Sequence, residues 1–210
     1  MKRIWIILLI VAISLIGCSN GGEKAETNQA EASREETVSI EDIEEEDVVA
    51  EIDGHELTGK DVIYEMKRLE LIALLQGTPK ESAAISPTAA IQELMQNHAL
   101  QDIASESEIT VNKEEQKERA EAVRADVETV DGYEAVMEGI DENLFWSKEE
   151  NRYESILAAE ALVAKLMEEE KEVHPNYTEE ALRFDAQKEL NELIQQKIGE
   201  TDVEIYVESE

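Results

Sequence analysis

The sequence predicts a mainly α-helical protein whose folded part, residues 48–210, contains about five helices and a small sheet that pairs the first strand with the last. Three observations support this prediction. The 210 residues include only nine Gly and three Pro and are rich in Glu, Ala, Leu and Lys, so long segments can run as helix. Helix-capping residues recur between positions 58 and 200. Strand patterns occur only near the two ends, and because a lone hairpin is marginal in water, we expect the end strands to pair.

Residues 1–17 have the features of a signal peptide. Lys2 and Arg3 precede a short apolar stretch that is too short to span a bilayer as a helix. The stretch ends in Leu15-Ile16-Gly17-Cys18, which resembles a bacterial lipobox. That resemblance implies that Cys18 accepts a diacylglyceryl group, becomes the first mature residue and anchors the protein to the outer face of the cell membrane. The alternative is an ordinary secreted protein in which Cys18 stands by chance.

Residues 18–47 are expected to form a disordered acidic tether that begins at the lipidated Cys18. This segment is rich in acids, Ser, Asn and Gly and has no aromatic residue, so it buries too little apolar surface to order itself. The acidic run at 44–47 is interpreted as part of a solvated spacer, because it lacks the regular ligand spacing and turn glycine of a calcium loop. Binding of calcium or of a basic partner is the alternative for this run.

Two segments have strand patterns. Residues 48–57 are rich in β-branched residues and contain Asp53-Gly54, a dipeptide typical of tight hairpin turns. Residues 203–208 alternate apolar and polar side chains, which is the pattern of a half-buried strand.

Five helices are expected between these strands, each with a recognisable start. The starts are Thr58 with Asp61, Ser86 with Pro87, Asn112 with Glu115, Ser147 with Glu150, and Thr178. Apolar residues recur at helical spacing after each start. The predicted ends are Gly77 for the first helix, Asp131-Gly132 for the third, His174-Pro175 for the fourth and Gly199 for the fifth, with a short turn at 133–137 between the third and fourth helices.

The charge excludes one class of function. The chain carries 51 acidic and 19 basic residues, a formal charge of −32, which removal of residues 1–17 would bring to about −34. Such a surface repels a phosphate backbone, so we predict no nucleic-acid binding. The excess of acidic residues could attract basic clients or divalent cations. The alternative, which we slightly favour, is that it serves solubility at high salt or high pH.

No catalytic, cofactor or metal motif is recognisable. The single Cys excludes an internal disulfide and any multi-cysteine metal site. His55, His98 and His174 are far apart and match no zinc pattern, so a metal site would have to be assembled wholly by the fold. We expect His98, near the apolar face of the second helix, to be a core or groove-edge residue. Neither a nucleophile elbow nor a glycine-rich phosphate loop is present.

Leu144, Phe145 and Trp146 form the densest aromatic cluster in the mature chain. They are the candidate residues of a peptide-binding groove, since an apolar surface with a polar rim suits a protein that holds unfolded chains. The favoured alternative is that they pack the start of the fourth helix onto the core.

Four passages resemble the SurA and PrsA group of extracytoplasmic chaperones. They are VVAEIDGHELTGKDVIYEM from residue 48, AIQELMQNHAL from residue 90, EITVN at 108–112, and the last helix followed by DVEIY at 202–206. In this family the first and last strands pair, and a parvulin-type isomerase domain can be inserted before the last helix. The corresponding segment here, 172–177, is too short for that domain.

The resemblance implies a SurA N-terminal-type module in residues 48–210 that binds unfolded or partly folded exported polypeptides without isomerase activity, enzyme chemistry or a cofactor. Two alternatives stay open. One is a peptidyl-prolyl isomerase whose activity lies in the remaining frame. The other is a cell-surface binding or assembly lipoprotein that uses the same frame for one dedicated partner.

Overall fold

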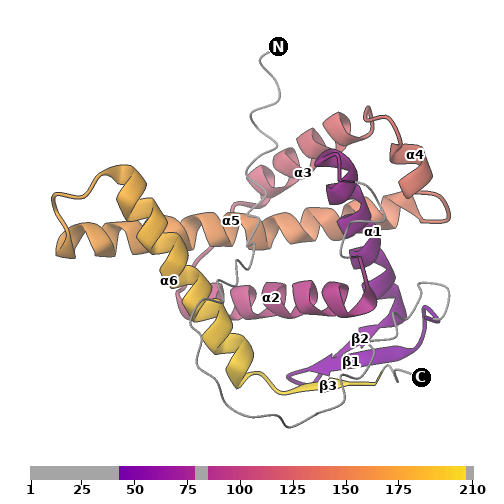
Figure 1. The fold of residues 1–210 in the computed structure, drawn as a ribbon, viewed down its shortest axis with the longest axis horizontal. Helices are drawn as coiled ribbons and strands as arrows, with labels where there is room; N and C mark the ends of the chain where they lie inside the picture. Colours follow the sequence, from indigo (N-terminus) through magenta and orange to yellow (C-terminus); the bar gives the residue numbers. More distant parts are fainter. Residues whose placement is uncertain (1–42, 79–84, 207–210) are drawn as a thin grey trace, which may run out of the picture.

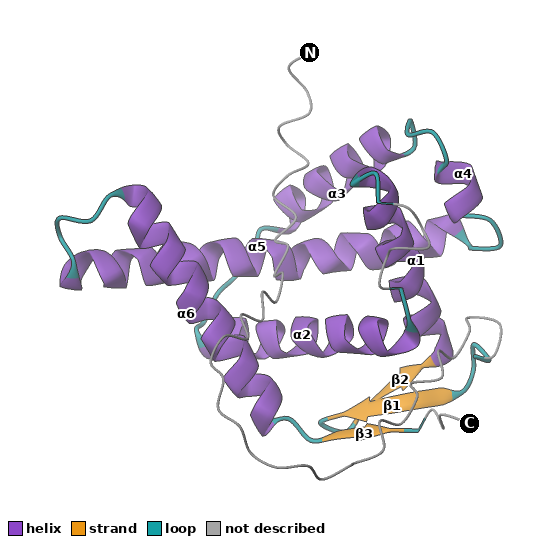
Figure 2. Cartoon of the chain, in the orientation of Figure 1, coloured by secondary structure: helices purple, strands orange, loops and turns teal. Residues whose placement is uncertain are grey.

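The computed structural model describes residues 43–78 and 85–206 (Figure 1), and in these residues the chain is mainly helical, as predicted. The elements follow one another as β1 (Val48–Ile52), β2 (His55–Thr58), α1 (Gly59–Leu75), α2 (Pro87–Glu106), α3 (Lys113–Val127), α4 (Tyr133–Val136), α5 (Glu142–Val173), α6 (Glu179–Glu200) and β3 (Val203–Ile205). The strands gather at one corner of the molecule, while the helices form the body (Figure 2).

The three strands form one antiparallel sheet in the order β2-β1-β3. The hairpin aligns Ile52 with His55, and the last strand aligns Val203 with Ile52 and Ile205 with Ala50. The predicted pairing of the first and last strands is therefore confirmed. Ala50 and Ile52 lie in the central strand and are fully buried, because β1 has a partner on each side and helices cover one face.

Four of the five predicted helix starts are confirmed. Thr58 and Asp61 form a reciprocal capping box at α1, and the side chains of Ser86, Asn112 and Thr178 each accept a backbone N–H at the start of their helices. These capping side chains accept backbone N–H groups of the first turn, which have no partner within the helix. A capping residue in the sequence is therefore enough to predict where its helix begins.

The predicted start of the fourth long helix at Ser147 is wrong. Helix α5 begins at Glu142, and the carboxylate of Asp141 accepts the backbone N–H groups of Asn143 and Leu144 at 3.0 and 3.1 Å. The Ser147 and Glu150 pattern lies inside the helix. An earlier start brings Phe145 and Trp146 onto the helix face that packs against the core, and this burial outweighs the local cap signal.

Three other predicted boundaries shift. Helix α3 ends at Val127, before the predicted end at Gly132, and the segment predicted as a turn at 133–137 forms the short helix α4. Gly132 has a φ of 98°, the left-handed backbone that allows the chain to turn between α3 and α4. Gly199 does not end the last helix, which continues to Glu200.

The ordered region also begins earlier than the predicted boundary at residue 48. Ile43 is buried against β1 and α1, and the carbonyls of Asp47 and Glu45 accept the N–H groups of Gly59 and Lys60 at 2.7 and 3.0 Å. Part of the acidic run predicted to lie in the tether therefore docks on the N-terminus of α1. Gly59 is required at this contact, because a Cβ there would lie 2.0 Å from the Glu44 carbonyl oxygen.

The core has three apolar clusters, two of which include residues of α5. The first lies between α2, α5 and α6, the second joins β1 to α1 and α2, and the third joins α1, α3 and α4 to the start of α5. Because α5 contributes to the first and third clusters, it connects α1, α3 and α4 at one end of the molecule to α6 at the other (Figure 1).

A network of charged side chains fills the junction of α1, α2 and α5. Arg68 donates to Glu65 one turn earlier on α1, and also to Glu93 of α2 at 3.1 Å. Arg152 of α5 lies 3.5 Å from the other oxygen of Glu65 and 3.6 Å from Glu93. Glu65 and Arg68 are buried, so their charges compensate each other rather than being solvated. Burial raises the pKa of the neighbouring Glu149 carboxyl, an effect that Arg152 and Arg68 partly offset.

No helix among the described residues is both long enough and apolar enough to cross a membrane. The predicted signal peptide and Cys18 lie outside those residues.

Candidate functional site

The structure places the predicted groove residues mostly in the core. Phe145 and Trp146 are 1% and 6% exposed, and Leu144 is half-buried. The Phe145 ring lies 5.4 Å from Trp146 and 6.1 Å from Tyr64 of α1. The indole N–H of Trp146 donates to the Tyr133 hydroxyl at 3.0 Å. The alternative favoured by the sequence, packing onto the core, agrees with this arrangement.

Three exposed apolar side chains lie within another segment, which we call the arm tip. It consists of residues 173–184, where α5 ends and α6 begins, and this end of the helix pair projects away from the rest of the molecule (Figure 1). Val173 is 70% exposed, Phe184 is 67% exposed and Tyr177 is 47% exposed. Large apolar side chains with this exposure leave surface in water that a partner could cover.

The base of the arm is firmly packed. Leu162 and Leu166 of α5 are buried against Ala186 and Leu190 of α6. This contact fixes the direction of both helices, so the connection 174–178 is held between two packed elements.

The connection has its own local order. The His174 ring stacks on Tyr177 with centroids 4.5 Å apart and planes 10° apart, and its Nε2 lies 3.7 Å from the Glu170 carboxylate. The N–H of Tyr177 donates to the His174 carbonyl at 3.0 Å. The Tyr177 ring is thus presented at the surface in a defined position.

Acidic side chains predominate around the arm tip, although Lys171 and Arg183 are also exposed there and Arg183 lies 3.4 Å from the Glu179 carboxylate. The exposed residues Glu168, Glu169, Glu172, Glu179 and Glu180 lie just before and after the connection on the two helices. Exposed apolar side chains among mainly acidic ones favour segments that combine apolar and basic residues, because the negative charge adds a long-range attraction to the short-range burial of the apolar side chains.

Sequence reasoning missed Val173, Tyr177 and Phe184, although one signal was available. Phe184 stands between Leu182 and Ala186, which belong to the buried stripe of α6. Two positions along a helix correspond to a rotation of about 200°. Phe184, two positions from both Leu182 and Ala186, must therefore lie on the opposite, polar face of the helix.

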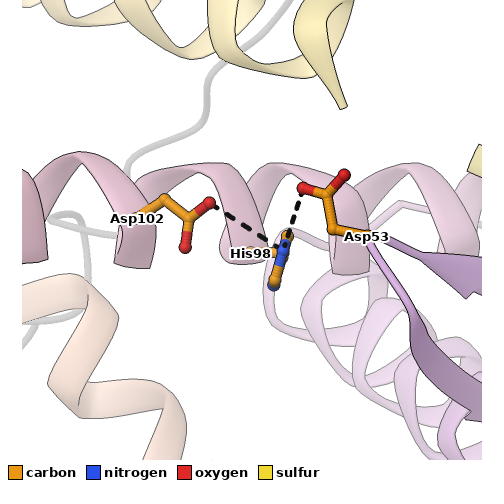
Figure 3. Close-up of side chains that lie close together, drawn as sticks. All are labelled: Asp53, His98 and Asp102. Carbon is orange, nitrogen blue, oxygen red and sulfur yellow. Dashed lines mark ion pairs between the residues drawn. The ribbon is translucent and has the colours of Figure 1, made fainter. Parts of the chain in front are cut away.

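The fold brings together side chains that the sequence left apart. Asp53 from the β1–β2 turn, His98 and Asp102 from α2 place one ligand-type atom each within 4.8 Å of one another (Figure 3). In residues 43–78 and 85–206 this is the only group of three His, Cys, Asp or Glu side chains close enough to share one ion. His55 is next to it, with its ring centroid 5.5 Å from that of His98, whereas His174 lies at the arm tip.

The expectation that His98 is a core or groove-edge residue needs refinement. Its side chain is 22% exposed, and Nε2 faces two carboxylates rather than apolar atoms. The sequence does hold a partial signal, because His98 and Asp102 are one helical turn apart and Asp53 and His55 flank a predicted turn. Only docking of the turn on α2 joins the two pairs.

No protein-family model, curated protein or solved structure matches this chain.

Proposed function

We propose that this protein is a lipid-anchored, extracytoplasmic chaperone-like protein that holds unfolded or partly folded exported polypeptides through the arm tip. The observation that carries the proposal is the exposure of Val173, Tyr177 and Phe184 at the end of a projecting, firmly packed helix pair. The sequence of residues 1–18 supports the location, since export and acylation of Cys18 would place the domain where exported chains emerge.

The proposed mechanism is reversible burial of apolar side chains and requires no chemical step. An apolar segment of a client covers the exposed side chains of the arm tip, and the surrounding glutamates attract basic residues that flank such a segment. The negative charge, about −34 once residues 1–17 are removed, also keeps a complex of protein and client soluble, because complexes of like charge repel one another.

The contribution of Phe184 to client binding follows from the fraction of its surface that is exposed. Complete burial of a Phe side chain is worth about 1.5–3 kcal/mol. Phe184 leaves 67% of its surface in water, so covering it contributes about 1–2 kcal/mol by the same scale. Replacing Phe184 by Ser should therefore weaken client binding by roughly five- to thirtyfold.

Site-specific photo-crosslinking in exporting cells tests the proposal. A photoreactive residue at position 184 should give a broad set of adducts with exported chains. The matched control is position 205, because Ile205 is also an exposed apolar residue, at 56%, but lies in β3 of the sheet. One discrete adduct from position 184 would indicate a dedicated partner, and equal labelling from both positions would show that the arm tip is not the binding surface.

A solution assay gives an independent readout. The full-length protein in detergent should suppress aggregation of a chemically unfolded protein at near-stoichiometric ratios, and Phe184→Ser should reduce this suppression while Ile205→Ser leaves it unchanged. Acceleration of a proline-limited refolding reaction at substoichiometric protein would instead favour an isomerase.

A further inference from the structure

The geometry points to a binding site for one divalent transition-metal ion of the zinc class. We propose that His98 Nε2 and one carboxylate oxygen each from Asp53 and Asp102 are its protein ligands. Nε2 of His98 lies 3.7 Å from Oδ2 of Asp53 and 4.0 Å from Oδ2 of Asp102 (Figure 3). This site is separate from the arm tip and does not depend on the proposed function.

The distances suit a small ion. Zinc binds imidazole nitrogen and carboxylate oxygen at about 2.0–2.2 Å, and a tetrahedral arrangement then separates neighbouring ligand atoms by about 3.4 Å. The two separations from His98 Nε2, 3.7 and 4.0 Å, exceed this value by a few tenths of an ångström, and all three ligand atoms lie within 4.8 Å of one another. Small side-chain rotations would close the difference, because none of the three side chains is fully buried.

The backbone of the turn holds Asp53 in place. Asp53 and Gly54 have φ values of 48° and 80°, the left-handed conformation that a two-residue hairpin turn of this kind requires. The backbone N–H of Asp202 donates to Oδ1 of Asp53 at 2.9 Å, and the N–H of Asp53 donates to the Asp202 carbonyl at 2.9 Å. Oδ1 is therefore occupied, and Oδ2 faces His98. A ligating carboxylate is typically oriented by such an additional hydrogen bond.

The other two ligands come from one face of α2. His98 and Asp102 are four residues apart, so their side chains project from adjacent turns toward the same side. Asp102 has a second neighbour, since Nζ of Lys197 on α6 lies 3.5 Å from its Oδ2 and 2.7 Å from Glu106. The ammonium group partly neutralises Asp102 and competes with a metal ion for the same oxygen.

His55 completes the surroundings of the site. It is exposed at the start of β2, and its ring stands edge-on to that of His98. Rotation of its side chain would supply a second imidazole, and water molecules can fill any remaining position because the site is open to solvent. Imidazole ligands favour zinc, copper and nickel over calcium and magnesium, which prefer oxygen alone.

A bound ion would join three parts of the fold. It would tie the β1–β2 turn to α2, and through the hydrogen bonds to Asp202 it would also stabilise the connection between α6 and β3. Binding to the folded state alone raises the unfolding midpoint. At a zinc concentration one hundred times the Kd, we expect a rise of about 5–10 °C for a chain of this size.

The test is a zinc titration of the full-length chain in detergent, with Cys18→Ser in every sample so that the thiol is not a ligand. We expect one zinc ion per chain and a rise in the unfolding midpoint. His98→Ala and Asp102→Asn should each weaken binding by at least about tenfold. The matched control is His174→Ala, because His174 also faces a carboxylate one turn away but belongs to no group of three potential ligands among residues 43–78 and 85–206.

A substitution of Lys197 should change the zinc affinity in the opposite direction. Lys197→Met removes the competing ammonium and should tighten zinc binding several-fold. Lys188→Met makes the same charge change on the same helix, at an exposed residue paired with Glu192, and should leave zinc binding unchanged. Equal zinc affinity in the wild type and His98→Ala, an equal midpoint shift with Ca²⁺, or no binding at micromolar zinc would overturn the proposal.

Discussion

Replacing Phe145 by Ala tests whether the aromatic cluster at the start of α5 is part of the core. Phe145 is 1% exposed and packs between Tyr64 and Trp146. The substitution removes most of a large side chain from a site closed by α1, α3 and α4, so the protein loses both the burial and the filling of that space. The perturbation thus acts on stability and leaves the arm tip untouched.

The magnitude follows from this environment. Truncation of a buried Phe to Ala costs about 3–5 kcal/mol, and two aromatic neighbours place Phe145 in the upper half of that range. Native domains are stable by about 5–15 kcal/mol, so we expect the variant to remain folded but to lose a large share of its stability. If the free energy of unfolding falls by about 2 kcal/mol per molar urea, the urea concentration at the midpoint of unfolding should be lower by roughly 2 M in the variant.

The assay is urea unfolding followed by far-ultraviolet circular dichroism and by the fluorescence of Trp146, the only Trp outside the predicted signal peptide. Phe184→Ala is the matched control, because the same truncation at a side chain 67% exposed should change stability by no more than about 0.5 kcal/mol. The reasoning is refuted if the two variants lose similar amounts, since burial would then not distinguish the two Phe residues.

Three further predictions concern other parts of the fold. Arg68→Ala leaves the buried Glu65 carboxylate without its nearest cation and should cost about 3–5 kcal/mol in urea unfolding; a loss below 1 kcal/mol would mean that water replaces the guanidinium. Gly59→Ala should lower the free energy of unfolding by about 1–3 kcal/mol, because the added Cβ would meet the Glu44 carbonyl. Gly139→Ser serves as a comparison, because Gly139 has open space around it and the substitution adds only the strain of a left-handed backbone. The third prediction concerns pH. Burial raises the pKa of Glu149 above its ordinary value of 4.5, so the folded state retains this proton longer than the unfolded state, and the unfolding free energy should fall as the pH rises from about 4.5 through the raised pKa. Glu149→Gln should remove that part of the pH dependence, and identical pH profiles for variant and wild type would contradict the role of burial.

Local signals in the sequence were sufficient for much of the architecture. A capping side chain acts within one helical turn, and a turn dipeptide acts on its own backbone, so Thr58, Ser86, Asn112, Thr178 and Asp53-Gly54 could be read without knowledge of distant contacts. The pairing of the end strands could also be predicted, because only two segments had strand patterns and neither is stable alone.

Tertiary contacts decided what local signals could not. Helix α5 begins before its apparent capping box because the extra residues bury Phe145 and Trp146 against α1 and α3. Phe145 and Phe184 both lie in helices, yet one is buried and the other is exposed, because exposure depends on which helix faces the neighbouring elements cover.

The same division applies to the candidate sites. The charge, the leader pattern and the short connection before α6 are properties of consecutive residues, and the sequence alone is enough to recognise them. The arm tip exists because α5 and α6 pack at their base and leave their joined ends uncovered. Asp53 and His98 meet only because the hairpin turn docks on α2, and Asp202, from the far end of the chain, orients the Asp53 carboxylate. Contacts between residues so far apart in sequence are set by how whole elements pack, and no local pattern encodes them.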